Sequence, residues 1–238
     1  MSRITITPGS RIDLLSLQDH HYNNAEPATI AAVLRANWYD TLAGVLVVSY
    51  PTLNADWRSI AFGPAFKLSC KGDLARKTNK HIRSIARIIV EPRFRGLGIA
   101  TQLVRHYLAS PLTPCTEAVS VLNAFIPLFS RAGMRRIDLP PSIRDRILTR
   151  QLADIHITPL DLATVATHSP LSPQNKLLLA AIHPWLLRWG QSHRGTRKLQ
   201  AATTLARYAA KSLLLPRVVF AAGSLAIPRQ SVAKPLCA

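Results

Sequence analysis

Short apolar runs alternate with longer amphipathic segments along the first 140 or so residues of the chain. Residues 42–50 and 85–90 are apolar runs rich in β-branched side chains, which is typical of strands buried within a sheet. The same patterns predict shorter strands at residues 3–7, 115–121 and 135–139, and helices at residues 28–37, 99–110 and 123–131. Strands and helices therefore interleave, which predicts an α/β (α+β) fold.

The run at residues 85–90 leads into a glycine-bearing turn and then a helix. Gly96 and Gly98 permit positive φ, and the helix that follows presents unpaired N–H groups at its first turn. With Arg93 and Arg95 beside it, this junction predicts an anion site. The spacing lacks the lysine and hydroxyl of a Walker loop and the third glycine of a dinucleotide fingerprint. The alternative is a strand–turn–helix whose glycines serve geometry alone.

The chain is strongly basic. Thirty Lys and Arg stand against twelve Asp and Glu, which gives the 238 residues a formal charge of +18. Such a charge favours binding to polyanions, with nucleic acid as the first candidate partner and an anionic membrane surface as the second. A genome that encodes generally basic proteins is an alternative explanation. A hydrophobic content of 48% is sufficient for a folded core.

The cysteines and the N-terminal segment predict a cytoplasmic protein. Cys70, Cys115 and Cys237 are odd in number and lack metal-site spacing, which suits a reducing compartment. The N-terminal segment has no apolar core of secretory length, and no stretch reaches the length of a membrane span.

Residues 63–83 carry a dense set of positive charges and little apolar periodicity. They lead straight into the central strand and predict a long loop that contacts a substrate, with a solvated excursion as the alternative. The predicted nucleic-acid-binding residues of this loop are Lys67, Lys71, Arg76, Lys77 and Lys80.

The character of the chain changes after about residue 142. No acid follows Asp161, whereas ten Lys and Arg do, and helical spacing recurs at residues 174–189 and 198–215. We therefore expect two parts, a domain over residues 1–145 and a basic, mainly helical C-terminal extension over residues 146–238 with a frayed tail. A basic amphipathic helix suits membrane or nucleic acid, and no base-reading motif is present.

The strand–loop–helix segment resembles the acyl-CoA-binding motif of the GNAT acetyltransferase superfamily. That motif reads Val-x-Pro and then Arg/Gln-x-x-Gly-x-Gly/Ala; here it stands as Val90-Glu91-Pro92-Arg93-Phe94-Arg95-Gly96-Leu97-Gly98-Ile99-Ala100. The resemblance implies a mixed, mostly antiparallel central sheet flanked by helices, and acetyl-CoA or another acyl-CoA as cofactor. The family's loop amides hold the CoA pyrophosphate, and its preceding strand pairs with the pantetheine arm. The implied cofactor-binding residues are Ile89, Val90, Arg93, Phe94, Arg95, Gly96, Leu97, Gly98, Ile99, Ala100 and Asn123.

The resemblance has one departure that bears on catalysis. Many members carry Leu-Tyr-x-Lys-x-Gly-Phe, and the matching run here is Leu128-Phe129-Ser130-Arg131-Ala132-Gly133-Met134. The family often uses that tyrosine to protonate the departing CoA thiolate, and Phe129 has no proton to give. Ser130 and Tyr22 are candidates for this role. Otherwise the thiolate leaves unaided, or the chain is a non-catalytic member.

Two carboxylates are candidates for the general base. Glu91 ends the central strand and Glu117 lies on the next one, and an acceptor amine that arrives protonated needs a base. A solvated or ion-paired acid at a strand end is the alternative interpretation of each.

Three features follow a common order: an early His-Tyr pair, an apolar strand that ends at Tyr50-Pro51, and the run from Phe129 to Met134. Over roughly residues 15–140 the chain thereby resembles a branch of the superfamily that includes the phage Mom-type DNA modification proteins. In the Mom type the implied reaction converts adenine in DNA to a carbamoylmethyl form, and a His-Tyr pair has been tied to iron. The matching pair here is His21-Tyr22, which the resemblance implies as metal ligands. A target base inside a duplex would have to be flipped out.

Three functions follow as hypotheses. The chain is a GNAT-fold enzyme that modifies an amine on nucleic acid, an ordinary N-acetyltransferase for a protein or small amine, or a non-catalytic nucleic-acid-binding scaffold. The sequence predicts neither the acyl group nor the oligomeric state.

Overall fold

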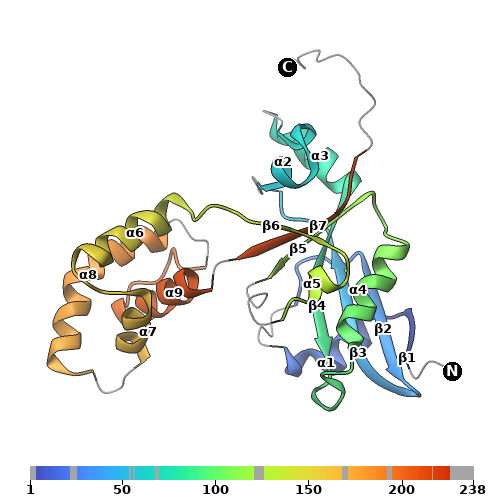
Figure 1. Ribbon diagram of the computed structural model, residues 1–238, viewed down its shortest axis with the longest axis horizontal. Coiled ribbons are helices and arrows are strands. Elements are labelled where there is room, and N and C mark those ends of the chain that lie inside the picture. The colour runs from blue at the N-terminus through green and yellow to red at the C-terminus, as the bar shows by residue number, and fades with distance from the viewer. Residues whose placement is uncertain are drawn as a thin grey trace. The chain divides into compact units, whose positions relative to one another are not determined.

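The computed structural model describes residues 4–21, 26–53, 55, 57–67, 70–120, 126–167, 171–191, 195–215 and 217–225. The chain divides into two units, one formed by Met1–Asp138 together with Val218–Ala238 and one by Leu139–Arg217 (Figure 1). We refer to them as the sheet unit and the helical unit.

A seven-stranded sheet in the order β1-β2-β3-β4-β5-β7-β6 forms the centre of the sheet unit. Its strands are β1 (Ile4–Pro8), β2 (Ala32–Trp38), β3 (Thr41–Ser49), β4 (Ile82–Val90), β5 (Cys115–Ser120), β6 (Arg135–Ile137) and β7 (Val218–Gly223). Every neighbouring pair is antiparallel except β4 and β5, which are parallel. The predicted mixed, mostly antiparallel sheet flanked by helices is therefore confirmed.

Helices cover both faces of this sheet, and β3 is accordingly apolar on both sides. Leu46 and Val48 pack toward α4 (Ile99–Ala109) and α5 (Leu128–Arg131), in a cluster that includes Leu103. Val45 and Val47 pack on the opposite face toward α1 (Arg11–Leu17). Such two-sided burial explains why β3 is a continuous apolar run instead of an alternating one.

The central strand β4 is irregular on one edge and only partly paired on the other. Val47 pairs with Arg87 and Val48 with Ile85, so Ala86 has no partner on β3 and forms a β-bulge. On the other edge, pairing with β5 runs from Ile82–Cys115 to Ile85–Ala118 and goes no further. Beyond Ile85 the two parallel strands diverge.

The helical unit lies in the chain between two paired strands of the sheet. β7 pairs antiparallel with both β5 and β6, and the whole of Leu139–Arg217 connects β6 to β7. This division differs from the predicted one, which assigned residues 146–238 to a single extension. The six-residue apolar run of β7 is too short for periodicity to distinguish a strand from the end of a helix.

The helical unit itself contains α6 (Ile143–Asp154), α7 (Pro159–Thr167), α8 (Pro173–Gln191) and α9 (Ala202–Leu214). Its core is a separate cluster that includes Leu152, Leu162, Ile182, Leu186 and Leu205. The helices predicted at residues 174–189 and 198–215 are present as α8 and α9. Within the described part of the chain, no helix combines the length and the apolarity that crossing a membrane would need.

The predicted helix at residues 28–37 is wrong, because β2 occupies this region. Its buried positions Val33 and Ala36 are three residues apart, which imitates helical spacing. Val33 packs with the α1 cluster and Ala36 with the α4 cluster, so the two side chains lie on opposite faces of one strand. Burial on both faces of one strand therefore produced the three-residue spacing that is typical of a helix with one buried face.

The predicted loop at residues 63–83 is also wrong. A 3₁₀ turn at Pro64–Phe66 and the helix α3 (Lys71–His81) occupy most of it, and β4 begins at Ile82. α2 (Trp57–Phe62) precedes them. The predicted helix at residues 123–131 is α5 over its last four residues, and residues 121–125 lie outside the described ones.

Gly223, at the end of β7, tests how closely β7 must approach the chain before β5. Its φ is +78°, and a Cβ there would lie 1.9 Å from the carbonyl oxygen of Pro114. We expect Gly223→Ala to lower the free energy of unfolding by about 2 kcal/mol or more in urea denaturation, because both strain and overlap oppose it. Gly72→Ala is the control, since a Cβ at Gly72 meets nothing within 4 Å. An unchanged urea midpoint for Gly223→Ala would contradict the placement of β7.

Candidate functional site

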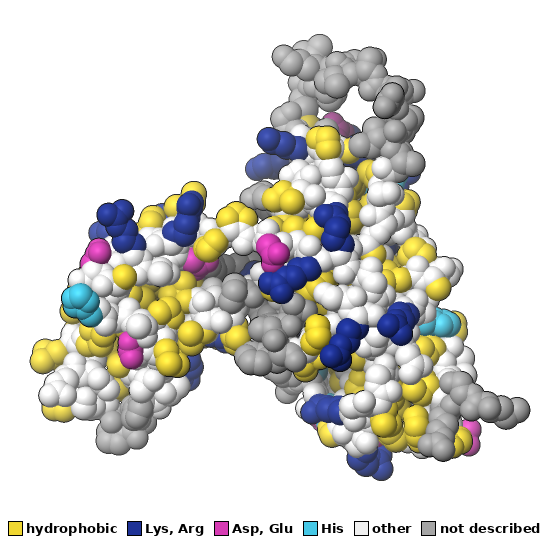
Figure 2. Space-filling model, viewed as in Figure 1, with side chains coloured by type: hydrophobic (Ala, Val, Ile, Leu, Met, Phe, Trp, Pro, Cys, Tyr) yellow, Lys and Arg dark blue, Asp and Glu magenta, His cyan; other side chains and the backbone are white. Residues whose placement is uncertain are grey.

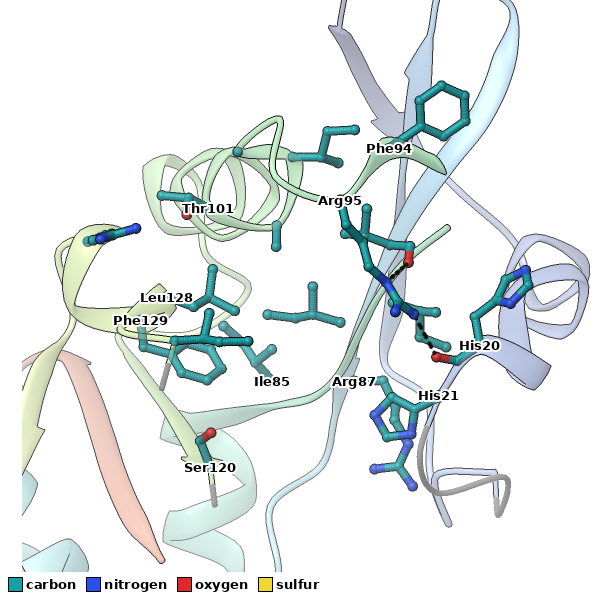
Figure 3. A pocket seen from close by; sticks show the side chains of 18 of the residues that line it. His20, His21, Ile85, Arg87, Phe94, Arg95, Thr101, Ser120, Leu128 and Phe129 are labelled. Carbon is teal, nitrogen blue, oxygen red and sulfur yellow. Dashed lines mark hydrogen bonds between the residues drawn. The ribbon is translucent and has the colours of Figure 1, made fainter. Parts of the chain in front are cut away.

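A cavity of about 590 Å³ opens where β4 and β5 diverge (Figure 3). Its wall includes Ile85 and Ile88, on the α4 side of β4, and Arg87 and Ile89, on the α1 side. The first turn of α4, the end of β5 and α5 complete the wall. The cavity therefore reaches both faces of the sheet through the gap between the two strands.

The loop between β4 and α4 presents backbone amides to this cavity. Gly96 has a φ of +84° and Gly98, the N-cap of α4, a φ of +77°. No side chain in the described part of the chain caps the helix, and the N–H groups of its first turn have no intrahelical acceptor. A Cβ at Gly96 would meet no atom within 4 Å, so the space over these amides is open. Open space, backbone N–H donors without an acceptor among the described residues, and the positive end of a helix together suit a phosphate.

Gly44 on β3 allows the start of α4 to lie close to the sheet. It pairs with Val90, and a Cβ there would come within 3.0 Å of the carbonyl oxygen of Ile89 and 3.2 Å of Cγ2 of Ile99. The sequence analysis did not single out this residue. The available signal was a glycine inside an apolar strand, which often marks the close approach of another backbone.

The two arginines of the loop are engaged by the protein itself. Arg95 donates through Nε to the carbonyl of Val90 and through Nη2 to that of His20, both at 3.3 Å (Figure 3). Arg93 donates through Nε to Oε1 of Glu91 at 2.6 Å. This hydrogen bond from Arg93 is the main cause that lowers the pKa of the Glu91 carboxyl. The two arginines therefore stabilise the conformation of the loop, and its backbone amides remain as the donors that an anion could bind.

Most of the predicted cofactor residues meet at the cavity. Those on its wall are Ile89, Val90, Phe94, Arg95, Gly96, Gly98, Ile99 and Ala100. Arg93 and Leu97 are exposed and lie off the wall. Asn123 lies outside the described residues.

The two candidate carboxylates do not line the cavity. Glu117 accepts two hydrogen bonds from Arg58 of α2, at 2.8 Å from Nε and 2.7 Å from Nη2, and both side chains are only 2% exposed. Glu91 pairs with Arg93, and its second oxygen, Oε2, is buried without a hydrogen-bond partner among the described residues. The geometry favours the alternative interpretation of Glu117, a structural ion pair.

Of the two candidate hydroxyls, the structure describes only that of Ser130. Ser130 is exposed and lies off the wall, and Tyr22 lies outside the described residues. Phe129 lines the cavity and packs against Phe220, with ring centroids 5.1 Å apart. Two hydroxyls that the sequence analysis missed, those of Thr101 and Ser120, come from residues on the wall.

The histidines lie at the α1 side of the cavity. His20 and His21 both belong to its wall, and His21 and Arg87 also line a smaller cavity behind it. Arg87 donates to the carbonyl of Ala86 at 2.9 Å. Over the described ranges, no group of three or more His, Cys, Asp or Glu is placed to hold a metal ion. The predicted iron site therefore gains no support from the described residues.

The charge of the cavity wall has one sign. Arg87, Arg95 and Arg131 lie on it with the two histidines, and its described residues include no Asp or Glu. This wall suits an anionic ligand.

The predicted nucleic-acid-binding residues do not lie on this wall. α3 leads into the first residue of β4, whereas the glycine loop follows its last. Lys67, Lys71, Arg76 and Lys80 are exposed, and Lys77 lies with its Nζ 5.9 Å from the centre of the Phe66 ring. These basic residues, which we call the α3 surface, form a separate feature of the sheet unit.

Comparisons with known proteins add a likeness of fold. No family profile and no curated protein matches the sequence. Among solved structures, yncA of Salmonella typhimurium with its cofactor acetyl-CoA is 13% identical, with a TM-score of 0.39 over 60% of this chain and 85% of that one. NAA60 of Arabidopsis thaliana in complex with acetyl-CoA is 18% identical, with a TM-score of 0.35 over 57% and 86%. At these values the likeness assigns no function.

Replacing Glu117 separates a structural role from a catalytic one. Removing one partner of a buried ion pair costs about 3–5 kcal/mol, so we expect Glu117→Gln to lower the urea midpoint sharply. The double variant Arg58→Met/Glu117→Leu should recover much of that stability, because neither charge remains unpaired. A Glu117→Gln protein of unchanged stability would contradict this interpretation.

Proposed function

We propose that this chain is an acyl-CoA-dependent N-acyltransferase of the GNAT type. The observation that carries the proposal is the amide-lined loop of Gly96 and Gly98, which opens onto the cavity between the diverging strands β4 and β5. This is the place where the sequence motif implies the CoA pyrophosphate. The residues present fit such a group, because the amides of Gly96 and Gly98 have no acceptor among the described residues and a Cβ at Gly96 would meet no atom within 4 Å.

The unpaired edge of β4 supports the next part of the proposal. Beyond Ile85 no described strand pairs with this edge, and residues from Ala86 to Val90 line the cavity, so backbone N–H and C=O groups of this edge face it. Backbone groups in such a position need partners. An extended ligand with its own amides, such as the pantetheine arm, can pair with them as an added strand would.

The reaction needs few side chains once the ligand is positioned. Acyl-CoA supplies a thioester; the acceptor amine forms the new C–N bond, the C–S bond breaks to release the CoA thiolate, and the proton lost by the amine ends on that thiolate, directly or through water. Orienting the two reactants is the largest contribution that the described wall can make. Its apolar part, including Ile85, Leu128 and Phe129, excludes water from the thioester.

Substitution of Gly96 tests the phosphate site. Gly96→Glu adds a carboxylate to the space assigned to phosphate, so we expect acetyl-CoA to bind at least about tenfold more weakly in calorimetric titration. Gly63→Glu is a matched control, since Gly63 also has a positive φ of +92° and open space around it but lies off the cavity wall. Equal affinity of Gly96→Glu and wild type would show that the amides do not hold the cofactor.

We further propose that the sheet unit binds nucleic acid through the α3 surface. The support is charge, because the surface has five basic side chains. The single acid of α3, Asp73, is already paired with Arg76 at 2.5 Å. On the face shown in Figure 2, Lys and Arg side chains of the sheet unit are accompanied by few Asp or Glu. Modification of adenine in DNA is the finer form of this proposal, and an ordinary acetyltransferase acting on a protein or small amine is the alternative.

The salt dependence of DNA binding tests the α3 surface. The plot of log K against log salt becomes shallower by about 0.9 for every lysine that no longer neutralises a phosphate of duplex DNA. We therefore expect Lys71→Gln/Lys80→Gln to weaken binding and to lower the slope by up to about 1.8, measured by fluorescence anisotropy. The control is Lys176→Gln/Lys211→Gln, which removes two lysines from the helical unit.

Two outcomes would count against this second proposal. One is an unchanged slope for the α3 variant together with a lowered slope for the control. The other counts against the adenine reaction alone. In it, mass spectrometry of digested DNA from a host that expresses the active protein detects only unmodified nucleosides. That second result would leave the ordinary acetyltransferase in place.

A further inference from the structure

Arg131 lies on the cavity wall, and its guanidinium has no partner among the residues that the structure describes. It ends α5, and its carbonyl oxygen accepts a hydrogen bond from Nη2 of Arg105 at 2.6 Å, which ties α5 to α4. Its own guanidinium makes no hydrogen bond or ion pair within the described part of the chain. Arg93 and Arg95, in contrast, are held by Glu91 and by backbone carbonyls.

The position of Arg131 separates it from the glycine loop. Gly96 and Gly98 lie before the first turn of α4, whereas Arg131 reaches the cavity from α5, the helix that packs beside α4. Ala100 and Thr101 of α4 also belong to the wall. The site thus offers two positive features on different elements, a set of amides and a guanidinium.

Two separated positive features suit a ligand with two separated phosphate groups. CoA has this chemistry, with a pyrophosphate in its chain and a phosphate monoester at the 3′ position of its ribose. A monoester carries up to two negative charges near neutral pH and accepts paired hydrogen bonds from a guanidinium. In the proposed function the amides of the glycine loop bind the pyrophosphate, which leaves the second phosphate group without an assigned partner.

We propose that Arg131 binds the 3′-phosphate of CoA and so makes the site selective for CoA over 3′-dephospho-CoA. The proposal rests on the proposed function, because it assigns a second contact to the same cofactor. The assignment agrees with the absence of any described carboxylate paired with Arg131, because a neighbouring acid would neutralise the guanidinium and repel the phosphate.

Four dissociation constants test the assignment. Acetyl-CoA and its 3′-dephospho form are titrated into wild type and Arg131→Gln at one ionic strength. We expect wild type to bind acetyl-CoA about tenfold to a hundredfold more tightly than the dephospho form. Arg131→Gln should lose that preference, with its affinity for the dephospho form unchanged.

The controls separate a specific contact from a general change in charge or folding. Arg136→Gln removes an exposed arginine that is paired with Asp138 and lies off the wall, so it should leave the preference intact. Arg131→Lys keeps the charge but not the planar fork and should retain part of the preference. Equal thermal unfolding of the variants shows that they are folded.

The remaining outcomes overturn the inference in distinguishable ways. An equal weakening of both ligands in Arg131→Gln would place the guanidinium on the pyrophosphate or the arm. Equal binding of both ligands by wild type would show that the 3′-phosphate is not read, and with Gly96→Glu still defective the proposed function would stand. Wild type that binds neither ligand would overturn the inference and the proposed function together.

Discussion

The site depends on where hydrogen bonding between β4 and β5 stops. The last pair is Ile85–Ala118, and the bulge at Ala86 follows at once on the other edge of β4. Parallel strands normally stay paired because unpaired backbone groups are costly when buried. Here the unpaired groups border a cavity instead, so the sheet itself provides both the opening and a row of donors and acceptors. The glycine loop and α4 are placed by the same strand, since they continue directly from its end.

The positive charges around this opening have two different uses. Arg93 and Arg95 are bound to the chain and stabilise the shape of the loop, whereas Arg131 is presented to the cavity. From the sequence, Arg93 and Arg95 are predicted to add charge at the anion site, and no role is predicted for the charge of Arg131. The difference arises from which acceptors the fold places near each one: Glu91 and the Val90 carbonyl lie next to the loop, and no described acid is paired with Arg131.

Local signals predicted the central part of the structure well. A β-branched run followed by Gly96 and Gly98 requires only neighbouring residues to specify a strand, a turn and a helix. Prediction failed where distant residues decide the outcome. β2 has helical spacing because two sides of one strand are buried. Glu117 resembled a general base in the sequence because its partner Arg58 is 59 positions away. The role of Gly44 likewise depends on Ile99, a residue on another element.

The place of the helical unit in the chain affects how the sheet is completed during synthesis. β5 lies between β4 and β7, and β7 emerges only after the whole of Leu139–Arg217 has been made. Until then one edge of β5 is unpaired and β6 has no neighbour, while the helical unit, with its own core, can already fold. Closing so long a connection is slow compared with forming a tight hairpin. Of the described strands, the one translated last is therefore an interior strand, and the nascent sheet carries an exposed edge that can pair with other chains until β7 arrives.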